Sequence, residues 1–138
     1  MQKMHKFPGN YKSLAKISHF VEQAIKEVGF NAKDAYSVEL AVEEACCNII
    51  DHAYGGEDKG VIECSTQVEG DCLQIILCDH GMPFNPENVP SPQLDIPLED
   101  LKEHGAGFYL MKKSMDSVHY ENRPGSGNLM ILKKQKTK

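Results

Sequence analysis

The sequence predicts an α/β domain in which helices cover one face of a mixed, mostly antiparallel sheet. Two segments near the N-terminus have the apolar spacing of amphipathic helices, and the two segments after them alternate as strands across a short turn. A further short helix and two closing strands complete the order. The 138 residues, of which 41% are hydrophobic and 25% charged, suit a single domain over residues 1–138.

The first helix is expected over residues 14–28, after a short extended piece around Phe7. Ser13 is its expected N-terminal cap, and Gly29 is its expected end because glycine readily ends a helix in the left-handed conformation. The positions between them repeat with helical spacing and carry the apolar side chains Leu14, Ile17, Val21, Ala24, Ile25 and Val28.

The second helix, over residues 38–54, is the part of the chain most expected to carry function. Asn31 and Asp34 supply capping signals before it. One apolar stripe runs along it and consists of Ala35, Val38, Val42, Ala45, Ile49 and Ala53. Glu44, Asn48 and His52 follow one edge of this stripe, and Glu43, Cys47 and Ile50 point roughly the other way.

A carboxylate and a carboxamide at the edge of a core are costly to bury unless a ligand, an ion or a partner uses them. Glu44 and Asn48 are therefore predicted to face a site. The alternative is that the two side chains satisfy one another through a hydrogen bond at the edge of the helix.

Two strands are expected over residues 61–68 and 72–78, joined as an antiparallel hairpin by Glu69-Gly70-Asp71. The second strand ends at Asp79, and Gly81 follows. A strand end is a position from which a side chain can reach a cleft, and the glycine lets the backbone pass close to a ligand.

Residues 85–104 hold four prolines and show little periodicity, which predicts a lid or binding loop. An ordered, proline-stiffened surface loop is the alternative. Gly105, Ala106 and Gly107 then lead into a helix over residues 108–115, where free backbone N–H groups could bind an anion. Strands over residues 118–121 and 129–133 close the chain.

These side chains together describe a nucleotide phosphotransfer site. Asp79 could accept hydrogen bonds from an amino group on a flat ring. Asn48 could bind a hard cation such as Mg²⁺ through its amide oxygen. Glu44, one helical turn away, is placed to accept a proton from an attacking hydroxyl group.

The overall composition excludes several other classes. The net charge of -5, without a long stripe of Lys and Arg, argues against direct nucleic-acid binding. No apolar run approaches the length of a membrane span and no signal sequence is found, so no membrane contact and a cytoplasmic location are expected. The five cysteines, an odd number, fit reduced thiols.

Four motifs in order resemble the Bergerat ATP-binding fold shared by histidine kinases, gyrase, the Hsp90 chaperone and MutL. They are residues 44–48 with His52 following, residues 79–84 (DHGMPF), residues 105–108 (GAGF) and residues 125–127 (GSG). Within that superfamily the chain is similar to the anti-sigma-factor serine/threonine kinase branch. The resemblance covers nearly the whole chain.

The resemblance implies a two-layer αβ sandwich that binds ATP with Mg²⁺. By that resemblance Asn48 would hold Mg²⁺, Glu44 would be the catalytic base and Asp79 would read the adenine amino group. Gly81 would let the adenine ring approach.

The remaining positions of the resemblance concern the phosphates and the adenine ring. Gly105, Ala106 and Gly107 would bind phosphates. Asn128 stands where many relatives carry a Thr that holds adenine through water, so an altered adenine contact is expected there.

The same resemblance implies a protein kinase that phosphorylates a STAS-type anti-sigma-factor antagonist and exchanges it for a sigma factor. Many such kinases bind the sigma factor as dimers, which leaves monomer and homodimer open. A second hypothesis is an ATP-binding module that captures a sigma factor or another regulator without phosphotransfer. A third is a purely structural α/β domain.

Overall fold

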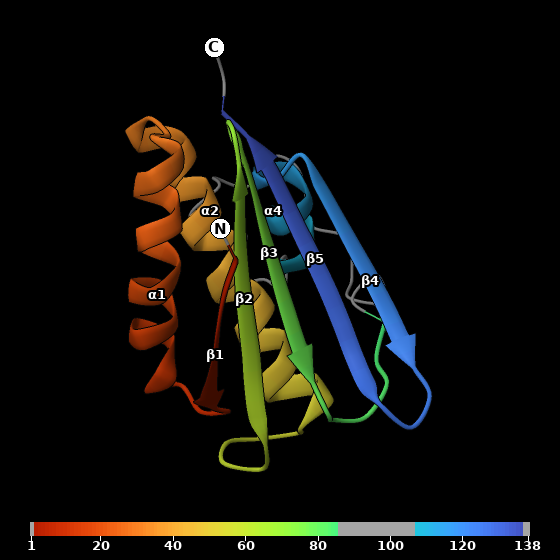
Figure 1. The fold of residues 1–138 in the computed structure, drawn as a ribbon. Helices are drawn as coiled ribbons and strands as arrows, with labels where there is room; N and C mark the ends of the chain where they lie inside the picture. The colour runs from red at the N-terminus through yellow and green to blue at the C-terminus, as the bar shows by residue number, and fades with distance from the viewer. Residues whose placement is uncertain (1, 86–106, 137–138) are drawn as a thin grey trace, which may run out of the picture.

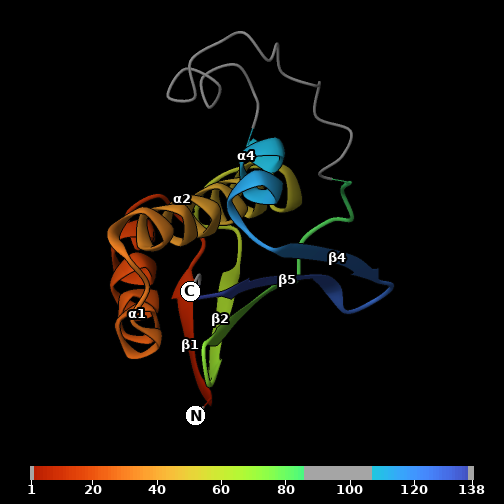
Figure 2. The ribbon, with the colours of Figure 1, turned by 90° about the horizontal axis from the view of Figure 1, so that it is seen from above.

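The structure is a computed structural model that describes residues 2–85 and 107–136. Five strands form one sheet in the order β1-β2-β3-β5-β4, and the helices lie on one of its faces (Figure 1, Figure 2). The strands are β1 (Gln2–Pro8), β2 (Val61–Glu69), β3 (Cys72–Asp79), β4 (Ser117–Arg123) and β5 (Gly127–Gln135). The helices are α1 (Ser13–Val28), α2 (Ala32–Asn48), a π-helix η1 (Ile49–Ala53) and α4 (Gly107–Ser114).

All four pairings between these strands are antiparallel, so the part of the sheet that the structure describes contains no parallel pair. The predicted fold class, helices on one face of a mixed, mostly antiparallel sheet, is confirmed, except that the described strands pair only in antiparallel fashion. Strand β1 is longer than the short piece expected around Phe7, because all seven of its residues pair with β2.

The capping of α1 differs from the prediction in one residue. Ser13 is the first residue of the helix, Lys12 precedes it without a side-chain cap, and the side chain of Asn10 accepts hydrogen bonds at this end of the helix. Its Oδ1 atom accepts hydrogen bonds from both the backbone N–H and the hydroxyl of Ser13, each at 3.0 Å. Gly29 ends the helix as predicted, with a φ of 82° and an N–H that donates to the Ile25 carbonyl.

The second helix begins directly after the predicted capping residue Asn31, before residue 38, and ends earlier than predicted. Asn31 caps α2 by accepting a hydrogen bond from the Asp34 N–H at 2.7 Å. After Asn48 the chain widens into the π-helix, in which the Tyr54 N–H donates to the Ile49 carbonyl five residues back, at 3.0 Å. The prediction of one continuous α-helix to residue 54 is therefore wrong.

The predicted direction of one side chain at this end of the helix, that of Ile50, is wrong. In an α-helix Ile50 would point away from the apolar stripe with Glu43 and Cys47, as predicted. Ile50, the second residue of the π-helix, is instead fully buried.

The core lies between the helices and the covered face of the sheet. The alternation predicted for the hairpin is confirmed, because every second residue of β2 and β3 is buried or packed against the core. Fully buried side chains of the core include Ile17, Val21, Val38, Ile62, Leu73, Ile75, Leu77 and Leu132. Within the described residues, no helix has the length and apolar character needed to cross a membrane.

Candidate functional site

Four of the predicted site side chains are buried polar groups, which is uncommon in a core made mostly of apolar residues. Glu44 and Asn48 lie on α2 and are 6% and 9% exposed. Asp79 ends β3 and Asn128 lies near the start of β5, and they are 2% and 3% exposed. Each of them therefore needs a hydrogen-bond partner inside the protein or on a ligand.

One polar atom of Asn48 lacks a hydrogen-bond partner among the described residues. Its amide nitrogen is buried and has no hydrogen-bond partner among the described residues. The Asn48 amide therefore donates no hydrogen bond to Glu44. This excludes the alternative in which the two side chains satisfy one another through a hydrogen bond donated by Asn48. Rotation about χ2 exchanges the amide oxygen and nitrogen, so either atom could face a ligand.

Asp79 is held in one orientation by hydrogen bonds to only one of its two carboxylate oxygens. Its Oδ1 atom accepts from the Gly81 N–H and from the Asn128 amide nitrogen, both at 2.9 Å. Its Oδ2 atom accepts no hydrogen bond from a described residue. Burial raises the pKa of Asp79, while the bonds from Gly81 and Asn128 oppose that change. The carboxyl group is thus fixed in place with one oxygen left for a donor on a ligand.

Gly81 lies against the end of the π-helix. A Cβ atom added to it would lie 2.5 Å from the Ala53 carbonyl oxygen, and the next residue, Met82, donates its N–H to that same oxygen at 2.7 Å. The turn after Asp79 is thereby joined to the end of the helical segment that carries Glu44 and Asn48. The need for glycine here already follows from this contact inside the protein.

Two tyrosines that sequence reasoning did not select also contact this turn. The Tyr54 hydroxyl accepts a hydrogen bond from the His80 N–H at 2.9 Å and donates to the Val61 carbonyl at 2.6 Å. The Tyr120 hydroxyl lies 3.1 Å from Asn128 Oδ1 and 3.3 Å from the Phe84 backbone nitrogen. Nothing in their sequence positions indicates these contacts.

The predicted phosphate-binding residues are described only in part. Gly107 is the first residue of α4, a helix that contacts α2, and the predicted helix there is confirmed. Gly105, Ala106 and all of the predicted lid over residues 85–104 except Asn85 lie outside the described residues. His52, expected beside Asn48, is exposed, and its ring lies 5.9 Å from that of Phe84.

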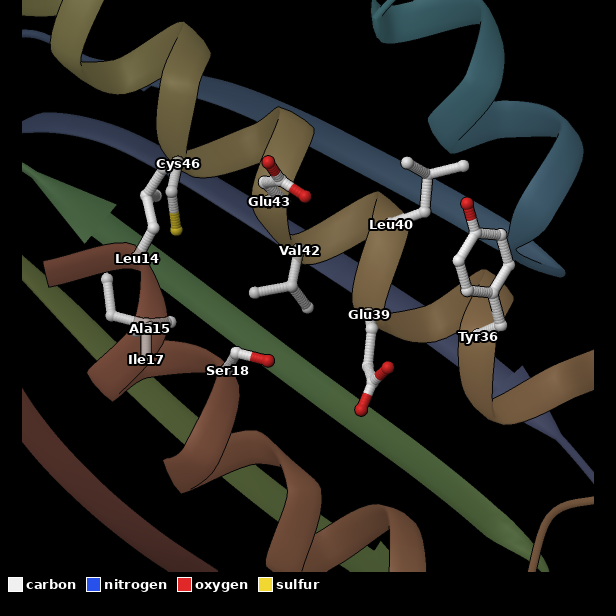
Figure 3. Close-up of a pocket in the computed structure, with 10 residues that line it drawn as sticks. All are labelled: Leu14, Ala15, Ile17, Ser18, Tyr36, Glu39, Leu40, Val42, Glu43 and Cys46. Carbon is white, nitrogen blue, oxygen red and sulfur yellow. The ribbon is translucent and has the colours of Figure 1, made fainter. Parts of the chain in front are cut away.

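A cavity of about 320 Å³ lies elsewhere, between α1 and α2, with side chains from both helices facing it (Figure 3). Its walls include Leu14, Leu40, Glu39 and Glu43. None of the predicted site residues lines it. Among the described residues there is also no group of three or more His, Cys, Asp or Glu side chains that could hold a metal ion.

Comparison with known proteins identifies the class to which this fold and site belong. The model of the histidine kinase-like ATPase domain family matches residues 7–134. The chain therefore belongs to the histidine kinase-like ATPase family, as its motifs predicted.

The curated relatives identify a narrower group within the family. The chain is 32% identical over 129 residues to the serine-protein kinase RsbW of Bacillus mycoides (strain KBAB4), which covers 91% of this chain and 80% of the relative. The RsbW of Bacillus cereus (strain Q1) matches with the same identity and coverage. The predicted resemblance to the serine/threonine kinase branch is confirmed.

Solved structures share the fold at lower sequence identity. The RsbU and RsbW domains of Rv1364c from Mycobacterium tuberculosis match 98% of this chain with a TM-score of 0.68 and 14% identity, and the chain spans 32% of that longer chain. The catalytic domain of the histidine kinase ThkA matches with a TM-score of 0.55 and 16% identity, covering 99% of both chains. These likenesses establish the two-layer architecture.

Proposed function

We propose that the protein is an ATP-dependent serine/threonine protein kinase that phosphorylates a STAS-type anti-sigma-factor antagonist and also holds a sigma factor. The relatives at 32% identity, which are named serine-protein kinases, support the reaction. The observation that carries the proposal is the buried Asn48 amide, whose nitrogen has no partner among the described residues, one turn from Glu44 on the same helix.

Each buried polar side chain has a role in this proposal. Asp79 accepts a hydrogen bond from the adenine amino group through Oδ2, the oxygen that no described residue uses. Asn48 binds Mg²⁺ through its amide oxygen, because amide and carboxylate oxygens are the ligands that Mg²⁺ prefers. Gly81 keeps the turn beside Asp79 close to the ring, and Asn128 supports Asp79 from β5.

When bound, ATP would supply the phosphoryl group, and Mg²⁺ held by Asn48 would neutralise charge on the phosphates. Glu44 accepts the proton of a Ser or Thr hydroxyl on the antagonist while the hydroxyl oxygen bonds to the γ-phosphorus. The bond from that phosphorus to the bridging oxygen breaks, and ADP leaves. Gly105, Ala106 and Gly107 are proposed to bind the phosphates through backbone N–H groups, which suits their place before or at the first turn of α4.

ATP binding is tested first by thermal unfolding with and without ATP and Mg²⁺. A ligand at 100 times its dissociation constant stabilises a fold by about 2.7 kcal/mol, which is several degrees in a domain of this size. Asp79→Asn should abolish this shift. The matched control is Asp71→Asn, at an exposed turn residue, which should keep it. Absence of a shift in the wild type at millimolar ATP would refute the nucleotide site.

Phosphotransfer is tested by incubating the protein with γ-labelled ATP and a STAS-type antagonist. Glu44→Gln should slow transfer about 10²–10⁴-fold, the usual loss when a general base is removed. Glu27→Gln, at an exposed position of α1, should leave the rate unchanged. Transfer by Glu44→Gln at the wild-type rate would show that Glu44 is not the base.

The second candidate function is an ATP-binding module that captures a sigma factor or another regulator without phosphotransfer. This module would bind ATP through the same buried Asn48 and Asp79, so the thermal test of ATP binding does not separate it from the kinase. ATP-dependent capture of a sigma factor, with no label on any antagonist tried, would favour the module over the kinase.

A homodimer belongs to the proposal as well. Ile76 of β3 pairs with Ile131 of β5, and Leu129 follows on the same face of the sheet. Their neighbours in the strands, such as Ile75 and Leu132, point into the core, so this apolar patch lies on the face opposite the helices. Light scattering after size exclusion, with Ile131→Lys as the disrupting variant, would decide between monomer and dimer.

A further inference from the structure

Three backbone N–H groups of the turn from Asp79 to Phe84 donate hydrogen bonds, two to the end of the π-helix and one within the turn. The His80 N–H donates to the Tyr54 hydroxyl, and the Met82 N–H donates to the Ala53 carbonyl at the end of the π-helix. The Gly81 N–H donates to Asp79 itself. The bonds to Tyr54 and Ala53 attach one side of the turn to the helical layer.

Asn128 attaches the other side of the turn to β5. It lies directly opposite Asp79 in the register of β3 and β5. Its amide nitrogen donates to Asp79 Oδ1 at 2.9 Å and to the Met82 carbonyl at 3.0 Å. Both protons of the amide are used, so Asn128 binds the start and the middle of the turn at once.

Asp79 and Met82 set the orientation of the Asn128 amide, and Tyr120 contacts its oxygen. With the nitrogen facing two acceptors, the Oδ1 atom faces the Tyr120 hydroxyl at 3.1 Å. The reversed orientation would place the amide oxygen against the Asp79 carboxylate, which repels it. Burial and the nearby Asp79 charge raise the pKa of Tyr120, so its hydroxyl keeps its proton at neutral pH.

Tyr120 also binds the end of the turn. Its hydroxyl accepts from the Phe84 N–H at 3.3 Å and lies within hydrogen-bond distance of the Phe84 carbonyl and of Asn122 Oδ1. The Tyr120 and Phe84 rings are 5.5 Å apart. The single hydroxyl proton is shared among three acceptors, so Tyr120 joins β4, β5 and the last residue of the turn at one point.

We infer that Tyr120 is a positioning residue for recognition of the adenine base, acting through Asn128 and Phe84 to hold the turn so that Asp79 presents Oδ2 to the amino group. This inference rests on the proposed function, because it needs the base to bind at Asp79. Tyr120 itself does not contact the base. Loss of its hydroxyl removes the partner of Asn128 Oδ1 and the contacts at Phe84, so the end of the turn is unanchored and Asn128 and Asp79 are held less firmly.

The test compares binding of ATP and of ITP, each with Mg²⁺, to the wild type and to Tyr120→Phe. ITP carries an oxygen where ATP carries the amino group, so a fixed Asp79 should favour ATP. Tyr120→Phe should bind ATP about tenfold more weakly, the effect of one lost hydrogen bond in a buried network, and ITP less than twofold more weakly. The preference for ATP over ITP should therefore fall by about the same factor.

Controls separate this effect from general loosening of the fold. Tyr36→Phe, at an exposed tyrosine of α2, should change neither affinity. Unfolding without nucleotide shows the temperature at which each variant is folded, and binding is measured below it. Asn128→Ala, which removes both amide bonds to the turn, provides a second variant if Tyr120→Phe does not fold, and its ATP preference should fall as well.

Three outcomes would contradict the inference. Tyr120→Phe with wild-type affinity for ATP would overturn it while leaving the proposed function intact. Equal losses of ATP and ITP affinity in Tyr120→Phe would also overturn it, because they would show a role in the fold alone. A wild type that binds no ATP would overturn the proposed function and this inference together.

Discussion

Replacement of Gly81 by alanine tests why a glycine follows Asp79. The resemblance to ATP-binding relatives implies that this glycine makes room for the adenine ring, whereas the structure places it against Ala53. An added Cβ atom would lie 2.5 Å from the Ala53 carbonyl oxygen, 2.6 Å from its carbonyl carbon and 2.8 Å from its Cβ. Two of these atoms are backbone, so no side-chain rotation relieves the clash.

The size of the effect follows from these distances. Carbon atoms pack at about 3.5–4.0 Å, so the turn must move by about 1 Å. Such a shift takes the 2.7 Å hydrogen bond from Met82 to Ala53 beyond its normal range. Overpacking costs about 1–3 kcal/mol and a lost hydrogen bond about 1 kcal/mol, which together give about 3 kcal/mol. At about 2 cal/mol/K per residue, the 138 residues convert this into a loss of about 10 °C in Tm.

The assay is thermal unfolding of the protein without nucleotide, because the clash is internal. Gly70→Ala is the matched control, since Gly70 has a φ of 58° and no atom within 4 Å of an added Cβ. Gly70→Ala should lower the free energy of unfolding by only about 1–2 kcal/mol, the cost of placing alanine in the left-handed conformation. If Gly81→Ala unfolded within about 2 °C of the wild type and only lost ATP affinity, the glycine would serve the ring and the reasoning from Ala53 would be wrong.

The remaining predictions concern Asp79 and Tyr54. Burial raises the pKa of Asp79 above 3.8, although the bonds from Gly81 and Asn128 and the nearby His80 oppose this, so the carboxylate lowers stability at neutral pH. This loss of stability should disappear as the pH falls through the raised pKa and Asp79 becomes protonated, whereas the affinity for ATP should decline over the same range. Denaturation and ATP titration from about pH 7 to 4, each compared with Asp79→Asn, should therefore show stability rising and ATP affinity falling in the wild type. Tyr54→Phe should cost about 1 kcal/mol by removing one hydroxyl that serves two backbone groups, and an unchanged denaturation midpoint would contradict this.

The sequence predicted those parts of the fold that depend on periodicity. Alternation in β2 and β3 placed Ile62, Ile75 and Leu77 in the core, because a strand exposes each face every second residue. The sequence could not predict the π-helix, since residues 49–53 have an ordinary helical composition and the extra residue in the helical turn depends on tertiary packing. The start of α1 was misplaced by one residue because Asn10 and Ser13 are both good capping residues, and only the geometry shows that Asn10 accepts from the Ser13 N–H.

The candidate site shows the same division. Asp79, Asn48 and Glu44 could be selected from the sequence because a polar side chain at a strand end or core edge is unusual. The two tyrosines could not, because each contacts residues far along the chain: Tyr54 binds the N–H of His80, 26 positions on, and Tyr120 that of Phe84, 36 positions back. An aromatic residue in a helix or strand is ordinarily a packing residue, so no local pattern distinguishes them.

The hydrogen bond between the Met82 N–H and the Ala53 carbonyl bears on the length of the phosphate chain that the proposed nucleotide site accepts. It ties the turn that holds Asp79 to the end of the helical segment that carries Asn48, and Gly81 lies in contact with the same carbonyl. The adenine-reading and magnesium-binding groups of the proposed site therefore keep a constant separation. A nucleotide must span that separation with its ribose and phosphate chain, so the number of phosphates becomes a property that the scaffold itself can select.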